Sequence, residues 1–374
     1  MKNISIALVR SRYAEDGGAE RFVGRALESL KTQQLSLTLV TREWRSGDGY
    51  DVVTCNPFYL GRLWRDWSFA RCVCRELAQR KYDLVQSHER IACCDIYRAG
   101  DGVHREWLKQ RARVLGPAAR LGLALNPYHA YVKAAERALF ASPRLKAVIC
   151  NSKMVKEEIR HYFGLPDEKL PVIHNGVDTE DFHPRLRQHR SAVRGKFNIP
   201  ENARLFLFVG SGFERKGVAV LLDVMAQMPP HVFLLIVGRD KRMEDYQRRA
   251  AQRGLSGRVI FAGSQPDVRP YYGSADALVL PTLYDPFPNV VLEAMASGLP
   301  VITSTKCGAA ELVESGGAGM VCDALDISAL GKAMQALLVP ERAAGMGRAA
   351  RAIAERFDLG GMARELSALY DRLV

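Results

Sequence analysis

The sequence predicts an α/β protein made of two doubly wound domains. Its 374 residues are enough for about two domains of ordinary size. Short runs rich in Val, Ile, Leu and Phe alternate with stretches of helical periodicity along the chain. Such alternation predicts parallel sheets with helices on both faces. The runs fall into two sets, which predicts two sheets and therefore two domains facing each other across a cleft.

The expected strands are the short apolar runs. In the first domain they are residues 4–9, 37–41, 84–88, 147–152 and 171–177, and in the second residues 204–211, 232–238, 258–263, 277–281 and 300–305. Helices are expected between them, for example over residues 19–31 and 217–228. A polar, proline-containing stretch, residues 174–190, separates the two sets. It predicts an N-terminal domain over residues 1–180 and a second over 181–356.

The net charge of +12 lies mostly in the first half of the chain. Residues 1–190 carry 32 Lys and Arg against 22 Asp and Glu, whereas residues 191–374 carry 21 against 19. The first half is therefore expected to meet an anionic partner, such as nucleic acid, an anionic membrane surface or a phosphorylated glycan. No apolar run approaches the roughly 18 residues of a membrane span. The first residues resemble a strand more than a signal peptide.

Cysteine usage gives an expectation about the compartment. The eight cysteines are at positions 55, 72, 74, 93, 94, 150, 307 and 322. They form no CxxC pair and no spacing typical of a metal site. In a chain without a recognisable signal peptide this predicts reduced thiols in the cytoplasm, most of them small core residues.

The turn after the first strand is a candidate anion site, because ligands of doubly wound sheets bind at the carboxyl ends of the strands. Gly17 and Gly18 precede a helix that begins near residue 19. Glycines let backbone N–H groups approach a ligand, and a helix N-terminus favours an anion. A plain tight turn is the alternative interpretation.

A second candidate turn, residues 209–222, follows the first strand of the second domain. Gly212 and Gly217 have the spacing of a P-loop, but Val and Ala stand where its Lys and Ser or Thr belong, which excludes that type of ATPase. Gly210 and Gly212 lack the third glycine of the dinucleotide fingerprint. Arg215 and Lys216 can neutralise a pyrophosphate without a metal, unless they are simply a solvated basic pair.

The stretch 284–301 joins a proline-containing loop to an apolar helix. The backbone donors that remain beside its prolines, and that could face a phosphate or a sugar, are those of Phe287, Asn289 and Val290. Glu293, in or near the first helical turn, is a natural acceptor for two vicinal hydroxyls such as those of a ribose. Asp285 could hold a second polyol. The alternative is that Glu293 is only a favourable acid near the positive end of a helix.

No D-x-D, HExxH or G-x-S-x-G pattern occurs, so the sequence predicts neither a metal site nor a nucleophile elbow. Together the motifs resemble the retaining GT-B glycosyltransferases of the E-x7-E family. The resemblance spans nearly the whole chain and rests on Gly17–Gly18, Asn151–Ser152, residues 174–178, Arg215–Lys216 and residues 285–302, in the family's order. It implies the GT-B fold, two Rossmann-like domains facing across a cleft, with a last helix at about 357–374 returned to the first domain.

The resemblance also implies roles in donor binding. Glu293 would bind the nucleotide ribose. Asp285, shorter than the Glu usual in the family, would contact the donor sugar. Arg215 and Lys216 would stabilise the leaving diphosphate, and Gly18 would approach the donor phosphate and sugar.

Near the anomeric centre many members of the family carry a His in the first domain. In the corresponding stretch here, residues 97–107, Asp101 is expected nearest that position, with His104 as the alternative. Asp101, Arg215, Lys216 and Asp285 are therefore the expected catalytic residues.

Within the family the chain most resembles the lipopolysaccharide core glucosyltransferases. The implied reaction transfers a hexose, glucose, from a UDP-sugar to a lipid-linked or phosphorylated glycan, the heptose of the inner core, with retention of configuration. No metal or other cofactor is implied beside the nucleotide-sugar. The alternatives are a GT-B nucleotide-sugar epimerase and a glycosyltransferase for another acceptor. Basic charge alone supports a nucleic-acid-binding protein, so no nucleic-acid partner is expected.

Two basic stretches also contain aromatic and aliphatic residues. They are residues 104–122, with Trp107, and residues 61–81, with Trp64 and Trp67. This mixture suits an anionic membrane interface, although an ordinary solvated helix face is the alternative. It predicts a peripheral protein on the cytoplasmic face of an inner membrane, held without a spanning helix.

Overall fold

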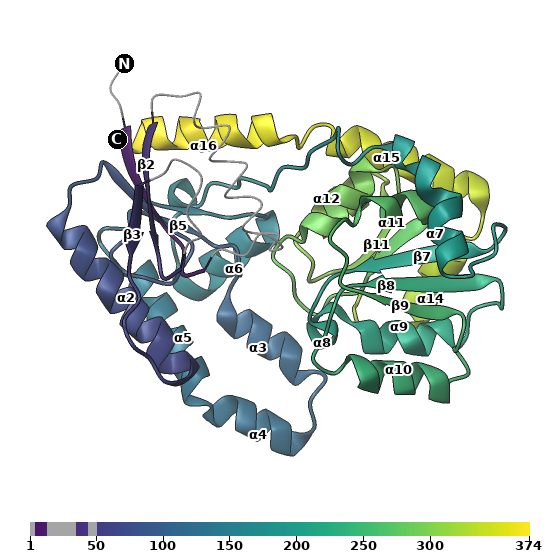
Figure 1. The fold of residues 1–374 in the computed structure, drawn as a ribbon. Helices are drawn as coiled ribbons and strands as arrows, with labels where there is room; N and C mark the ends of the chain where they lie inside the picture. Colours follow the sequence, from purple (N-terminus) through teal and green to yellow (C-terminus); the bar gives the residue numbers. More distant parts are fainter. Residues whose placement is uncertain (1–3, 13–34, 44–50) are drawn as a thin grey trace. The chain divides into compact units, whose positions relative to one another are not determined.

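The computed structural model describes residues 4–12, 35–43 and 51–374. The chain forms two compact units, shown in Figure 1. Unit 1 comprises residues 1–175 and 359–374, and unit 2 comprises residues 176–358. The chain therefore passes between the units twice. The two connecting segments pair with each other at their unit 2 ends, where Val177 N–H donates to Phe357 O at 2.9 Å.

Unit 1 contains a six-stranded sheet in the order β3-β2-β1-β4-β5-β6, in which every paired strand is parallel. Its strands are β1 (Ile4–Val9), β2 (Leu35–Thr41), β3 (Asp51–Thr54), β4 (Leu84–Ser87), β5 (Ile96–Arg98) and β6 (Ala147–Ile149). This is the order of the dinucleotide-binding doubly wound fold, in which the chain changes direction between β1 and β4. The strands expected at 4–9, 37–41, 84–88 and 147–152 are confirmed.

One expected strand of unit 1 is wrong. Residues 171–177 make only isolated bridges, at Val172 and Val177, and form no strand. The sequence also gave no expectation of β3 or β5, which have only four and three residues. Their sequences, DVVT and IYR, include charged or polar residues and do not form an apolar run like those that indicated the other strands. The helix expected over residues 19–31 lies outside the described residues.

Helices cover both faces of the unit 1 sheet. They are α2 (Gly61–Gln79), α3 (His104–Ala112), α4 (Pro117–Leu125), α5 (Pro127–Phe140), α6 (Lys153–Phe163) and α16 (Leu359–Leu373). The buried residues of α16 recur at helical spacing, at Met362, Leu366 and Leu369, and pack on Ile6 and Leu8 of β1. The last helix of the chain therefore closes the core of the first unit (Figure 1).

Unit 2 repeats the architecture. Its parallel sheet has the order β12-β11-β10-β7-β8-β9, again with the change of direction between its first and fourth strands. The strands are β7 (Arg204–Val209), β8 (Val232–Val237), β9 (Val259–Gly263), β10 (Ala277–Leu280), β11 (Val301–Ser304) and β12 (Gly319–Cys322). All but β12 were expected. The predicted class, two doubly wound Rossmann-like α/β domains, is confirmed.

The helices of unit 2 lie before, between and after its strands along the chain. They are α7 (Arg190–Lys196), α8 (Phe213–Lys216), α9 (Val218–Met225), α10 (Met243–Gln252), α11 (Arg269–Ser274), α12 (Asn289–Ala296), α13 (Ala310–Ser315), α14 (Ile327–Ala336) and α15 (Pro340–Ala354), with short 3-10 turns at η1 (Asp167–Lys169) in unit 1 and η2 (Pro184–His189) in unit 2. One continuous hydrophobic core joins them to the sheet. That core makes unit 2 a rigid frame for the loops at its strand ends.

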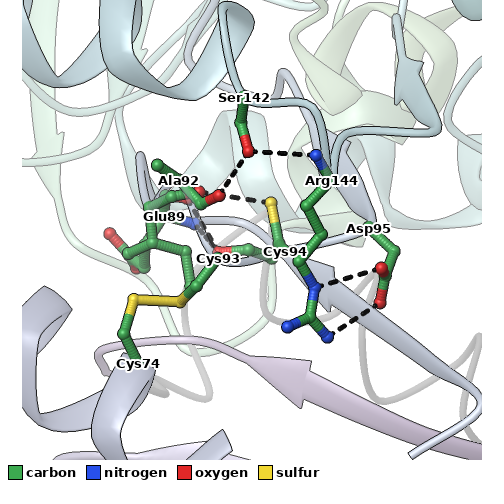
Figure 2. The surroundings of a disulfide bond; sticks show 10 residues. Cys74, Glu89, Ala92, Cys93, Cys94, Asp95, Ser142 and Arg144 are labelled. Atoms are coloured by element: carbon green, nitrogen blue, oxygen red, sulfur yellow. Dashed lines mark hydrogen bonds and ion pairs between the residues drawn. A yellow bond between two sulfur atoms is a disulfide. The ribbon is translucent and has the colours of Figure 1, made fainter. Parts of the chain in front are cut away.

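The prediction that all the cysteines are reduced is wrong for Cys74 and Cys93, which form a disulfide (Figure 2). Helix α2 lies beside the loop between β4 and β5, and this brings the two Cα atoms to 5.7 Å, within the range a disulfide requires. The partners are 19 residues apart and follow no recognisable motif. The remaining six cysteines are free thiols. Cysteine usage therefore no longer supports a fully reduced protein.

Candidate active site

The change of direction in each sheet identifies where a ligand binds. In doubly wound sheets the crevice lies at the carboxyl ends of the two strands between which the chain reverses direction. In unit 2 these strands are β7 and β10. The turn after β7 carries Gly210, Arg215 and Lys216, and the loop after β10 carries Asp285. Two motifs that lie about 70 residues apart in the sequence thus meet at one sheet edge.

The two loops are joined by a buried ion pair. Lys216 Nζ donates to Asp285 Oδ2, and both side chains are less than a tenth exposed. Arg215 NH2 lies 3.8 Å from the same oxygen, but the Arg215 side chain is 43% exposed. The backbone joins the loops as well, because Leu283 N–H donates to Arg215 O at 2.8 Å. The site therefore has one buried cation with its counter-ion and one cation that reaches solvent.

Asp285 is held as a carboxylate. Burial alone would raise its pKa, but Lys216, Arg215 and the backbone N–H of Phe287 together hold the pKa below its ordinary value. The neighbouring loop fixes the backbone, since Asp285 N–H donates to Lys306 O at 2.9 Å and Gly308 N–H donates to Asp285 O at 2.8 Å. The Phe287 amide, expected to face a ligand, serves the Asp285 carboxylate in this structure.

Two glycines make this close approach possible. Gly217 has φ +78°, and a Cβ there would lie 2.1 Å from Pro281 O in the loop after β10. Gly210 has φ +151°, and its missing side chain leaves room for the Lys216 chain, whose Cε would lie 3.4 Å from a Cβ. Both positions have a backbone conformation that favours glycine, and at Gly217 the space also requires it. Gly217, one of the two glycines with P-loop spacing, therefore serves contact between the β7 and β10 turns.

Glu293 lies in the second turn of α12, four residues after its first residue, Asn289. Because the helix starts after Pro288, Glu293 directly follows the first turn, in agreement with the expected place in or near that turn. The backbone donors of Asn289 and Val290 are at the N-terminus of α12. Glu293 is 5% exposed and accepts a hydrogen bond of 2.7 Å from the Tyr272 hydroxyl. It is a buried, oriented carboxylate and more than a surface acid near a helix end.

In unit 1 the corresponding edge lies after β1 and β4. Gly17 and Gly18 lie outside the described residues. The loop after β4 places His88 directly at this edge, 8% exposed. Burial, with the cations Arg10 and Arg98 nearby, holds the pKa of His88 well below its ordinary value. The imidazole is therefore neutral, and its Nε2 lies 3.4 Å from Gln86 Nε2.

His88 is a candidate that the sequence analysis missed. Its signal was available, because it directly follows the apolar run 84–87, and that run is the strand at which the sheet order reverses. Only the strand order distinguishes this turn from the others. Gln86, two residues earlier, also accepts a hydrogen bond of 2.8 Å from the hydroxyl of Tyr370 on α16.

Asp101 and His104 follow β5, one strand away from the reversal. The Asp101 side chain is 68% exposed and lies 3.5 Å from Arg90 NH1. His104 is buried at the start of α3, and its Nε2 lies 3.0 Å from His129 Nδ1. Burial and the nearby Arg90, His129 and Lys133 lower the pKa of His104 to about 3. Asp101 can therefore reach a ligand, whereas His104 belongs to the packing between α3 and α5.

The Asn151–Ser152 motif has a structural role. Ser152 is the N-cap of α6, where its hydroxyl accepts from Val155 N–H at 3.2 Å. Asn175, in the motif at residues 174–178, accepts from Arg98 NH2 at 2.6 Å. Among the described residues, no cluster of His, Cys, Asp and Glu side chains could hold a metal ion. The polar groups of the unit 2 edge suit a polyanion that carries hydroxyl groups.

Comparison with protein families places both units in one class. Residues 16–181 match the model "Glycosyltransferase Family 4", and residues 189–353 match "Glycosyl transferases group 1". Two doubly wound domains with these two models define the GT-B class. The chain is a GT-B glycosyltransferase, as the sequence predicted.

Three curated relatives show which glycosyltransferases the chain is similar to. The lipopolysaccharide glucosyltransferase WaaG of Escherichia coli is 26% identical over 325 residues, 84% of each chain. The lipopolysaccharide core biosynthesis glycosyltransferase LpsE of Rhizobium meliloti is 31% identical over 39% of this chain and 42% of its own. An uncharacterized glycosyltransferase of Methanocaldococcus jannaschii is 33% identical over 45% of this chain. The alignment spans only 44% of that relative.

Solved structures agree on the fold. The crystal structure of WaaG superposes with a TM-score of 0.84 at 22% identity and covers 98% of this chain and 99% of its own. HepE of Anabaena in complex with UDP-glucose superposes with a TM-score of 0.75 at 20% identity and covers 99% of this chain and 100% of its own.

Proposed function

We propose that the protein transfers glucose from UDP-glucose to a lipid-linked glycan, the heptose of a lipopolysaccharide inner core, with retention of configuration and without a metal. The observation that carries this proposal is the pair of cations on α8 at the β7–β10 edge, one buried against Asp285 and one open to solvent. A departing nucleoside diphosphate develops negative charge. Preorganised cations at that point stabilise the transition state more than the ground state.

The donor fits the three elements of the unit 2 edge. Arg215 and Lys216 face the diphosphate, the Glu293 carboxylate accepts the ribose hydroxyls, and Asp285 contacts the sugar. The names of the relatives support the donor and acceptor. WaaG is a lipopolysaccharide glucosyltransferase, LpsE acts in lipopolysaccharide core biosynthesis, and HepE binds UDP-glucose.

The charges in the site support transfer without a metal. A bound Mg²⁺ would normally neutralise the diphosphate, and in this proposal Arg215 supplies an accessible positive charge, beside Lys216, which is paired with Asp285. Arg215 offers a planar fork of donors to phosphate oxygens, and Lys216 a point charge. In unit 1, His88 and Asp101 are the two groups proposed to act beside the reacting sugar.

An assay with and without an acceptor tests the proposal against an epimerase. UDP-glucose is incubated with the protein in the presence or absence of a heptose-terminated lipopolysaccharide core. A transferase releases UDP in proportion to acceptor and adds one hexose to it. Conversion of UDP-glucose to another UDP-sugar would favour the epimerase. UDP release at a rate that does not depend on the acceptor would favour a simple hydrolase.

The identity of the base can be tested separately. Thermal-shift measurements compare UDP-, GDP- and ADP-glucose at equal concentration. A ligand that binds only the folded protein raises Tm by mass action. We expect the largest rise with UDP-glucose. A larger rise with GDP- or ADP-glucose would reassign the donor and leave the transferase class intact.

The proposal includes attachment to an anionic membrane through unit 1. Helix α4 has no buried residue, and it exposes Leu121 and Leu125. Helix α2 exposes Trp64 and Trp67 near its start. Tyr128 on α5 joins that helix to α2, because its hydroxyl donates to Asp66 Oδ2 at 3.0 Å and its ring lies under Arg62 at 4.3 Å. Helix α5 in turn contacts α4 within unit 1 (Figure 1).

The same part of unit 1 carries exposed cations. Exposed basic side chains of α2, of α3 and the turn after it, and of α4 are Arg62, Arg71, Arg105, Lys109, Arg113 and Arg120. Each basic residue near an anionic surface contributes about 1 kcal/mol of attraction. None of the helices that the structure describes is long and apolar enough to cross a membrane. The proposed attachment is therefore peripheral, on the cytoplasmic face of an inner membrane.

Co-sedimentation with liposomes tests the attachment. We expect binding to vesicles that contain anionic lipid, weak binding to neutral vesicles and loss at high salt. Leu121→Ser with Leu125→Ser should weaken binding, whereas Val339→Ser, at an exposed aliphatic residue of unit 2, should not. Equal binding to anionic and neutral vesicles, or an effect of Val339→Ser as large as that of the α4 pair, would refute this surface.

A further inference from the structure

A tyrosine outside the expected donor site contacts Glu293 directly. The Tyr272 hydroxyl donates to Glu293 Oε2 at 2.7 Å, and the same hydroxyl lies 3.5 Å from Val290 O. Tyr272 is fully buried, and Glu293 is 5% exposed. The hydrogen bond therefore joins two side chains that are almost fully shielded from water. A buried hydrogen bond to an ionised group is among the stronger ones in proteins.

Tyr272 packs closely against neighbouring segments of unit 2. Its helix, α11, lies against η2 so closely that a Cβ on Gly273 would be 1.9 Å from Leu186 O. The Tyr272 ring packs edge-on against Phe182 with 5.6 Å between centroids. The backbone beside Tyr272 is thus in close contact with η2, and its side chain is fully buried. These contacts hold the hydroxyl in place within unit 2.

The Glu293 carboxylate needs a hydrogen-bond partner that fixes its orientation. Its backbone is anchored, because the Ser297 hydroxyl donates to Glu293 O at 2.8 Å. Its side chain, however, has three rotatable bonds between the helix and the carboxylate. To accept hydrogen bonds from two vicinal hydroxyls, a carboxylate must direct one oxygen at each hydroxyl. A carboxylate rotated away from that orientation can accept from only one of the two hydroxyls.

We propose that Tyr272 is a positioning residue that orients the Glu293 carboxylate and so determines selection for a ribose over a deoxyribose in the donor. This inference rests on the proposed ribose-binding role of Glu293. Tyr272 need not touch the nucleotide, because it acts by holding Oε2. The ligand class it selects is a nucleotide with both the 2′ and 3′ hydroxyls present.

Titration calorimetry with two nucleotides tests this role. UDP and 2′,3′-dideoxy-UDP are titrated into the wild-type protein, into Tyr272→Phe, Glu293→Gln and Tyr271→Phe, and into the double variant with Tyr272→Phe and Glu293→Gln. Tyr271 is the matched control, because it is also a buried tyrosine of α11 and its ring lies 6.2 Å from Phe197. A readout based on the ratio of two affinities is insensitive to a general loss of folded protein.

We expect the wild-type protein to prefer UDP, and Tyr272→Phe to weaken UDP binding about tenfold while leaving binding of the dideoxy nucleotide unchanged. Tyr271→Phe should leave both affinities unchanged. In Glu293→Gln the added Tyr272→Phe change should have no further effect on the ratio, because the tyrosine acts only through the carboxylate.

Each contrary outcome has one meaning. If wild type prefers UDP and Glu293→Gln abolishes the preference, but Tyr272→Phe keeps it, the positioning role is wrong and the ribose role of Glu293 stands. If wild type binds both nucleotides equally, the ribose role fails and the positioning role fails with it. If Tyr272→Phe weakens both nucleotides equally, the tyrosine supports only the fold.

Discussion

Lys216 and Asp285 form a buried ion pair that joins the turn after β7 to the loop after β10. Both residues would be costly to bury alone, and each removes that cost for the other. The pair leaves Arg215, which is 43% exposed, as the cation open to an incoming anion. The donor site is thus built from a neutral buried pair and one accessible positive charge.

Arg215→Ala should lower kcat with little effect on stability. Its ion pair is long, at 3.8 Å, and partly solvated, so it contributes little to folding. Its charge is placed for the leaving diphosphate, and loss of such a group typically costs about 10²-fold in kcat. Steady-state kinetics with a parallel Tm measurement separates the two effects. An unchanged kcat in the folded variant would remove Arg215 from the catalytic residues.

Asp285→Asn should destabilise unit 2 in a way that depends on pH. The variant leaves Lys216 buried without its counter-ion, which costs about 3–5 kcal/mol near neutral pH. Because the folded pKa of Asp285 is lowered, its contribution is fully present above the unfolded pKa of about 4 and is lost as the pH falls through the folded value.

The stability gap between the wild type and Asp285→Asn should therefore shrink as the pH falls from the unfolded pKa of about 4 through the lower folded pKa of Asp285. Urea unfolding at a series of pH values measures this gap. Asp245→Asn, an exposed acid paired with Arg248 on α10, is the control and should change the free energy of unfolding by less than about 0.5 kcal/mol at pH 7. A gap that stays constant with pH would contradict the ion-pair account.

Asp101→Asn should fold normally and lose activity. The side chain is 68% exposed, so its removal disturbs no core.

His88→Ala should also lower kcat, because His88 lies at the strand reversal, whereas His104→Ala should mainly lower Tm, since it breaks the contact with His129. Measuring kcat and Tm for all three variants assigns the roles. Wild-type turnover in Asp101→Asn would leave His88 as the group nearest the reacting centre.

Reduction of the Cys74–Cys93 bond should lower stability. The bond closes a loop across 19 residues, and the chain-entropy model gives about 3 kcal/mol for a loop of that size. Unfolding with and without dithiothreitol measures the effect, and Cys74→Ser should reproduce it without reductant. Cys72→Ser, a free thiol on the same helix, is the control. Complete alkylation of Cys74 and Cys93 in the native, unreduced protein would show that the bond is absent.

Much of the fold was predictable because most of the strands coincide with apolar runs in the sequence. The runs containing β1 and β7 alternate with helices clearly enough to give the class. The short strands β3, β5 and β12 were missed, and residues 171–177 were wrongly expected to pair. An apolar run of that length forms a strand only if a neighbouring strand accepts it, and this depends on the tertiary fold.

The candidate site was predictable only in part. Arg215, Lys216, Asp285 and Glu293 were found from their motifs. Their pairing was not, because Lys216 and Asp285 are 69 residues apart and meet only through the strand order. The same reason explains why Tyr272 and the Cys74–Cys93 bond were missed, since neither lies in a recognisable local pattern. His88 follows an expected strand, and only the strand order distinguishes that strand from the others.

The central claim, metal-free transfer with retention at the Arg215–Lys216 edge, is tested most directly by the anomeric configuration of the product formed in EDTA. UDP-glucose, which is an α-glycoside, is incubated with the protein and a heptose-terminated lipopolysaccharide core in excess EDTA, and the new linkage is read by NMR. We predict an α-linked glucose, formed as fast as in Mg²⁺. A β-linked product, or transfer that stops in EDTA and returns with Mg²⁺, would contradict this mechanism.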